Sequence, residues 1–183
     1  MNTPQGFNDK VAFIWGVADL LRGDFKAHEY GQVILPFVVL RRLECALAPT
    51  KAKVIARAEQ LHGQVDNVDP ILRRTAGRRF YNVSPLDLTA LLNDPGNVAA
   101  NLSTYIAGFS PGAVEVLEKY GFHDKIKRLD DAGLLYQIVG KFAELDLTET
   151  AVSNADTGYS IEQPPRRFAA MSTETAGEHF TPP

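Results

Sequence analysis

The chain has 183 residues, of which 45% are hydrophobic, and its formal net charge is −3 at pH 7. This size suffices for one domain with a full core and a short tail, and the acidic balance argues against a protein that coats nucleic acid with a basic surface. The N-terminus lacks the basic and apolar regions of a signal peptide, and no uncharged apolar run approaches the roughly 18 residues of a membrane span. We therefore expect a cytoplasmic protein without a membrane partner.

The first predicted element is an amphipathic helix over residues 7–24. Its apolar residues recur at steps of three or four, the spacing of one helix face; they are Val11, Ile14, Trp15, Ala18, Leu21 and Phe25. This stripe predicts that Trp15 is a core residue and not a stacking platform. Gly23 contributes to the end of the helix.

A central buried helix is predicted over residues 30–47, where apolar residues are nearly continuous. Such a run also suits a buried strand, but its length and the polar turn from Arg41 to Glu44 favour a helix. Pro36 lies inside this helix and should kink it, because proline removes a backbone donor and crowds the carbonyl of the preceding turn. A more exposed helix rich in Ala, Lys, Arg and Glu follows over residues 49–62.

Further helices are predicted between proline and glycine breaks in the second half. Ser84 is the predicted N-cap of a helix that has Pro85 at its first position and Asp87 in its first turn and that runs to about Leu92. Three more helices are marked by apolar residues at helical spacing. These residues are Val98, Leu102, Tyr105, Ile106 and Phe109, then Ala113, Val116, Leu117 and Tyr120, then Leu134, Leu135, Ile138, Val139, Phe142 and Leu145.

The fold class is predicted to be all-α, because no alternating run of apolar and polar residues has the length of a strand. Residues 1–147 form the expected single domain of about eight helices. Residues 148–183 are rich in threonine and serine and contain two adjacent prolines at positions 164 and 165. We expect this tail to be irregular, and to be mobile or packed only against a neighbour, because it buries little apolar surface to offset the entropy of ordering.

Basic residues are concentrated in the middle of the chain. Residues 41–79 hold nine Lys or Arg against four Asp or Glu, whereas residues 80–183 hold seven against fourteen. Two arginine pairs five residues apart are expected to spread along more than a turn of helix and to reach successive phosphates, while Phe80 and Tyr81 anchor the segment to the core. A solvated helix face is the alternative. The candidate DNA-contacting residues are Arg73, Arg74, Arg78, Arg79, Lys51, Lys53 and Arg57.

The residue patterns predict no catalytic and no metal-binding residues. The histidines are scattered, without the i, i+4 spacing or the carboxylate grouping of a metal site. Cys45 is the only cysteine, so we expect no internal disulfide and a small core residue at this position. Asp130 and Asp131 are expected to begin a helix, where negative charge meets the helix dipole, and not to form a general acid and base. No nucleophile elbow, P-loop or Cys–His pair is present.

Five segments carry a family resemblance. Residues 18–23 (Ala-Asp-Leu-Leu-Arg-Gly), 30–43, 101–110, 134–147 and 176–182 (Ala-Gly-Glu-His-Phe-Thr-Pro) resemble, in the same order, segments of the modification subunits of type I restriction-modification systems, which are DNA adenine methyltransferases. The last of them resembles the passage from a helical N-terminal domain into the catalytic domain. The resemblance therefore implies that this chain is the beginning of a longer protein whose methyltransferase domain follows.

The resemblance also implies partners and a reaction. In this family the helical domain helps to clamp double-stranded DNA and assembles with a specificity subunit and a second modification subunit, and a restriction subunit joins the complete system. The catalytic domain transfers a methyl group from S-adenosylmethionine to the N6 of adenine. The positions that resemble one wall of the cofactor site are Glu178, His179, Phe180, Thr181 and Pro182.

One wall does not make a pocket, so this chain alone is expected to bind no cofactor and to be inactive. The glycine-rich turn of the methyltransferase sheet and the motif that receives a flipped adenine do not occur in it. A different class of function stays open beside the one that the family implies. It is a stand-alone helical module that binds only protein and does not contact DNA.

Overall fold

The computed structural model describes residues 5–148, and side chains from Asp9 onward. In that range the chain is helical and contains no strand, only two isolated bridges. The predicted all-α class is confirmed. The helices are α1 (Gln5–Leu21), α2 (Tyr30–Leu47), α3 (Lys51–Leu61), α4 (Asp69–Ala76), α5 (Leu88–Leu91), α6 (Val98–Ala107), α7 (Pro111–Lys119), α8 (Phe122–Asp131) and α9 (Leu135–Glu144), with 3-10 turns η1 (Ala27–Glu29) and η2 (Pro95–Asn97).

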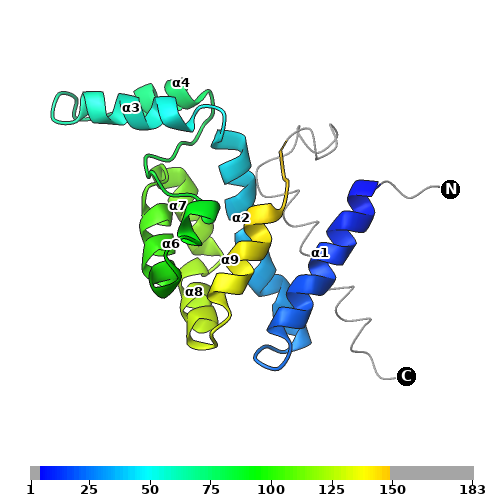
Figure 1. The fold of residues 1–183 in the computed structure, drawn as a ribbon. Helices are drawn as coiled ribbons and strands as arrows, with labels where there is room; N and C mark the ends of the chain where they lie inside the picture. The colour runs from blue at the N-terminus through cyan, green and yellow to red at the C-terminus, as the bar shows by residue number, and fades with distance from the viewer. Residues whose placement is uncertain (1–4, 149–183) are drawn as a thin grey trace.

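The core lies around α2 and α9. Figure 1 shows these two helices between α1 on one side and α6, α7 and α8 on the other. Aromatic rings connect the layers. Phe37 stacks on Phe142 at 5.2 Å between ring centroids, and Phe37 and Phe122 form a T-shaped pair at 4.9 Å. Such pairs add about 0.5–1.5 kcal/mol each beyond the area they bury. Four helices therefore share one aromatic cluster, since Phe13 of α1 also contacts Phe142.

The first two predicted helices are confirmed with one adjustment. The apolar stretch of α2 is helical through Pro36, so the strand alternative is excluded. In α1, Trp15 is only half-buried, whereas Phe13, which lies outside the predicted stripe, packs edge-on against Phe142. The core face of α1 is therefore rotated slightly away from Trp15. Cys45 is half-buried against the core, and this burial raises the pKa of its thiol.

The predicted cap at Ser84 is wrong. The N-cap is Asp87, whose carboxylate accepts a hydrogen bond from the Ala90 N–H at 2.7 Å, and α5 begins only at Leu88. Ser84 instead donates its backbone N–H to the Asn82 side chain at 2.6 Å. This turn is fixed by a contact distant in sequence, because the buried Asn82 amide donates to the Tyr105 carbonyl at 3.0 Å.

The predicted position of Asp130 and Asp131 at the start of a helix is also wrong. Both residues lie in the last turn of α8 and not at the start of α9. Their helix was not predicted. It buries three residues at steps of four and three, Phe122, Ile126 and Leu129, and Gly133 then reverses the chain with φ of 73°. Burial of this stripe outweighs the unfavourable meeting of two carboxylates with the negative end of the helix dipole, which costs on the order of 0.3–1 kcal/mol.

Helices α3 and α4 form a projecting unit, which we call the arm (residues 51–76). Figure 1 shows the two helices side by side and extending away from the other helices. Val54 and Leu61 of α3 and Leu72 and Ala76 of α4 are buried. Most of the remaining arm surface is polar and exposed. The expected exposed helix over residues 49–62 is thus confirmed as α3.

No helix between residues 5 and 148 combines the length and the apolar character that crossing a membrane requires. The expectations for the tail, including its irregular character, fall on residues 149–183 and lie outside the described residues.

Candidate nucleic-acid interface

The structure brings the predicted basic residues together on the arm and immediately after it. Lys53 and Arg57 are exposed on α3, and Arg57 donates a hydrogen bond to Gln60 at 3.2 Å. Arg73 and Arg74 lie in the last turn of α4. Cations there interact favourably with the carbonyl end of the helix dipole.

The two arginine pairs do not share one helix, in contrast to the expectation. Gly77 adopts a left-handed conformation with φ of 68° and ends α4 between the pairs. Its N–H bonds to the Arg73 carbonyl at 2.9 Å. A residue with a Cβ would be strained at this φ, so glycine permits the change of direction. Arg79 is exposed and Arg78 is half-buried in the segment that leaves the arm.

Arg73 is held by an acidic neighbour. Its Nε lies 2.9 Å from a carboxylate oxygen of Asp69, one turn earlier in α4. The other oxygen of Asp69 accepts a hydrogen bond from the Tyr81 hydroxyl at 3.0 Å. Burial, together with this bond to Asp69, raises the pKa of Tyr81 to about 12, so the hydroxyl remains a donor at neutral pH. The ion pair is partly exposed and contributes only about 0–1 kcal/mol to stability, but it orients one guanidinium of the patch.

Lys51 is placed differently from the other predicted cations. Its ammonium donates to the Leu86 carbonyl and lies 4.9 Å from the centre of the Tyr105 ring. Burial lowers the pKa of Lys51, and the carboxylates of Asp87 and Glu44 oppose that shift. The side chain is therefore turned toward the fold, and we leave Lys51 out of the surface that could face DNA.

A buried polar cluster lies behind Lys51. Glu44 is only 7% exposed, and its Oε1 accepts hydrogen bonds from the Leu88 N–H at 2.7 Å and from the Tyr105 hydroxyl at 2.9 Å. Its other oxygen pairs with the Arg41 guanidinium, and the Nε of Arg41 donates to the Leu145 carbonyl at 2.7 Å. Burial, followed by the proximity of Glu44, raises the pKa of Tyr105 well above its ordinary value.

This cluster was not predicted as a unit. The only local signal is the spacing of Arg41 and Glu44, three residues apart in an apolar helix. Buried charges need partners, and that rule could have indicated a donor facing Glu44 without naming it. The cluster joins α2, the start of α5, α6 and the end of α9, which is a structural role.

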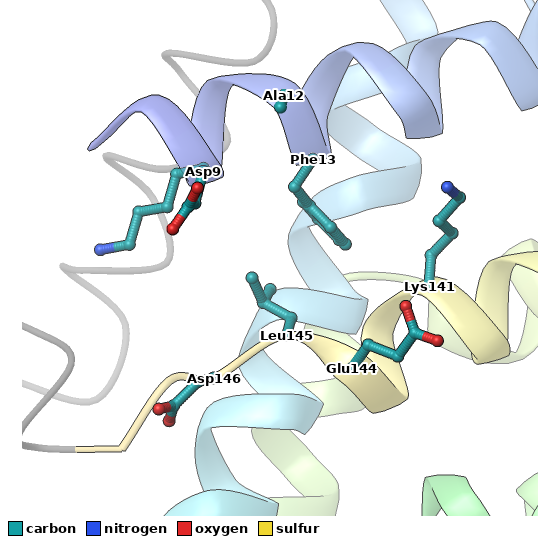
Figure 2. A pocket seen from close by; sticks show the side chains of 8 residues that line it. Asp9, Ala12, Phe13, Lys141, Glu144, Leu145 and Asp146 are labelled. Atoms are coloured by element: carbon teal, nitrogen blue, oxygen red, sulfur yellow. The ribbon is translucent and has the colours of Figure 1, made fainter. Parts of the chain in front are cut away.

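Two grooves flank α9. One of about 540 Å³ lies between α1 and α9, and Figure 2 shows Phe13 and Leu145 at its wall with acidic and basic side chains around it. Its charged residues include Asp9, Glu144 and Lys141. Carboxylates and ammonium groups both line it, so the groove does not concentrate charge of one sign. Among residues 5–148, no three or more side chains form a group that could hold a metal ion.

The HsdM N-terminal domain family matches residues 11–142, which is more than half of the chain. The chain belongs to this family. It is the N-terminal domain of a type I restriction-modification modification subunit. Comparison with curated proteins and with solved structures gives no match.

The match places the arm inside the HsdM N-terminal domain, since residues 11–142 run from α1 to α9 without omitting α3 or α4. The polar cluster around Glu44 lies within the same range. The positions that resemble a cofactor wall, Glu178 to Pro182, lie outside both the matched range and the described residues.

Proposed function

We propose that this HsdM N-terminal domain contacts the backbone of double-stranded DNA through its arm, within an assembled type I modification complex. The observation that carries the proposal is the clustering of cations on the projecting arm and just after it. Four of them belong to two arginine pairs in a protein of net negative charge. Asp69 pairs with Arg73, but like charges held close together still repel. A polyanionic partner relieves that repulsion. The proposed contacts are Lys53, Arg57, Arg73, Arg74, Arg78 and Arg79.

Contacts of this kind position a protein on DNA and do not read its sequence. Phosphate oxygens are common to every base pair, so guanidinium groups that reach only the backbone bind all sequences alike. The choice of target then belongs to another subunit, in agreement with the family, in which a specificity subunit selects the sequence. The arm contributes affinity and a clamp around the duplex.

We further propose the partners and the chemistry of the complete protein. The partners are a specificity subunit, a second modification subunit and, in the complete system, a restriction subunit. The reaction is methyl transfer from S-adenosylmethionine to the N6 of adenine, carried out by a methyltransferase domain that follows this helical domain. Residues 1–147 would form the helical domain and residues 148–183 the connection, with residues 178–182 as one wall of the cofactor site. Such a complex would act in the cytoplasm.

A titration of DNA binding against salt tests this proposal in the assembled complex. Phosphate contacts release counterions, so the affinity should fall steeply as salt rises, with a slope in log–log form of about 0.9 per contact. In the comparison complex the six proposed contacts are replaced with glutamine, and its salt slope should be shallower. An equal slope for both complexes would favour the alternative, a helical module that binds only protein.

A further inference from the structure

The arm meets the rest of the domain through a narrow base. The chain enters it after α2 and leaves it after Gly77, and Figure 1 shows both crossings at one end of α3 and α4. The two helices pack chiefly on each other. Thr50 closes the base by donating its hydroxyl to the Ala76 carbonyl at 3.1 Å. This bond joins the two ends of the arm but does not fix the arm to the other helices.

Lys51 supplies a first tie to the rest of the domain. It is the first residue of α3, and its ammonium reaches the Leu86 carbonyl and the face of the Tyr105 ring. Tyr105 is itself fixed, because it is 1% exposed and its hydroxyl donates to Glu44. A cation placed on an aromatic face and on a carbonyl gains from both. The start of α3 is therefore held against α6.

Tyr81 supplies a second tie at another point along the arm. Its backbone is fixed to the segment before α7, since its carbonyl accepts the Ser110 N–H at 2.9 Å. From there its hydroxyl reaches Asp69, the first residue of α4. Asp69 lies seven positions before Ala76 at the base, which corresponds to about 10 Å of helix. Two ties separated along the arm resist rotation about its base, whereas one tie would act as a pivot.

We propose that Lys51 and Tyr81 are positioning residues that hold the arm at one orientation against the domain, so that its arginines are prearranged for the DNA backbone. This proposal rests on the proposed function of the arm. The second tie also reaches a contact residue directly, because Asp69 pairs with Arg73 at 2.9 Å. Prearrangement raises affinity, because only the fraction of molecules with the arm correctly oriented is competent to bind.

The orientation of the arm can be measured in the full chain within the complex. Spin labels are attached to cysteines introduced at Gln64, in the turn at the end of the arm, and at Glu118 on α7, with Cys45 replaced by alanine. The parent protein should give one narrow distance distribution. Lys51→Met combined with Tyr81→Phe should broaden it. Lys53→Met is the matched control, since Lys53 is exposed two residues along α3, and it should leave the distribution narrow.

The conservative variant Lys51→Arg keeps a cation able to donate to Leu86 and to stack on Tyr105, and it should retain the narrow distribution while Tyr81 is present. Thermal unfolding of each variant identifies loss of folding separately. A distribution that stays narrow in the folded double variant overturns the positioning role, whatever happens to DNA binding.

DNA affinity separates this proposal from the one it rests on. The double variant should bind several-fold more weakly with an unchanged salt slope, because the same contacts form once the arm is oriented. Lys53→Met should make the slope shallower by about 0.9, because Lys53 is one of the proposed phosphate contacts. A shallower slope for Lys51→Met alone would overturn the positioning role in favour of direct contact. Broadening of the distance distribution with unchanged DNA affinity would overturn the proposed function of the arm. The positioning role of Lys51 and Tyr81 would still stand.

Discussion

Replacing Glu44 with alanine should strongly destabilise the domain. The change removes the acceptor of the Leu88 N–H and of the Tyr105 hydroxyl and leaves Arg41 without its carboxylate partner. Tyr105 is 1% exposed, so water cannot replace the missing acceptor without entering the core. Arg41 retains the Leu145 carbonyl and lies nearer the surface.

Two separate arguments give the expected loss of stability of Glu44→Ala. Each buried donor left without a partner costs about 1–3 kcal/mol, so the two donors together cost about 2–6 kcal/mol. Removing one member of a buried ion pair costs about 3–5 kcal/mol in general. Both arguments centre on about 4 kcal/mol, against a total stability of about 5–15 kcal/mol for a domain. The corresponding fall in the melting temperature is roughly 8–16 °C for a chain of this size.

Urea denaturation followed by far-UV circular dichroism measures this loss of stability. Glu118→Ala is the matched control, because Glu118 is exposed on α7 and its side chain has no hydrogen bond among the described residues; it should change stability by about 0.5 kcal/mol or less. Glu44→Gln keeps an acceptor oxygen and loses the charge, so its loss of stability should lie between those of Glu44→Ala and Glu118→Ala. A double-mutant cycle that combines Glu44→Ala with Tyr105→Phe should show a coupling free energy of about 0.5–3 kcal/mol.

A free energy of unfolding for Glu44→Ala within about 0.5 kcal/mol of that of the parent protein would refute the predicted loss. It would mean that the Leu88 N–H and the Tyr105 hydroxyl had found other acceptors.

Two further predictions concern packing and pH. Gly108→Ala should cost about 1–3 kcal/mol, as overpacking does, because a Cβ there would lie 2.9 Å from both the Asn82 side chain and Ser84; Gly112→Ala, with open space around it, should not destabilise in the same urea assay. The pKa of Glu29 is lowered to about 2 from an ordinary value of 4.5, first by a hydrogen bond from Arg128 and then by one from the Lys26 N–H. The ionised Glu29 carboxylate therefore stabilises the fold fully above pH 4.5, and this stabilisation is lost as the pH falls toward 2. The stability difference between the parent protein and Glu29→Gln should therefore shrink over that window, and a constant difference would contradict the assignment.

Much of the helical architecture could be predicted because it depends on local pattern. Helix α2 is long and apolar with one polar turn, and both features are visible in the sequence. The start of α5 could not be decided in this way, since Ser84 and Asp87 are both good capping residues. The choice is made by the bond between Asn82 and Tyr105, which are 23 residues apart.

The candidate DNA-contacting residues could likewise be predicted from the sequence only in part. The sequence alone identified the basic segment, and the structure places four of its cations on the projecting arm and two just after it. Lys51 and Lys53 look alike in the sequence, but only Lys51 has a partly buried carbonyl and an aromatic face within reach. Those partners come from Leu86 and Tyr105, and no local spacing indicates that either lies beside α3.

The central claim is that the arm and the segment just after it contact DNA phosphates. The most direct test replaces Arg73, Arg74, Arg78 and Arg79 together with glutamine in the assembled complex. Affinity for target and non-target duplex should fall by similar factors, and the slope of log affinity against log salt should become shallower by about 0.9 for each phosphate that the variant no longer reaches. Replacing the exposed lysines 119 and 127, which lie on other helices, should change the slope less. Normal DNA binding with an unchanged slope, together with failure to assemble with partner subunits, would contradict the account and identify the patch as a protein interface.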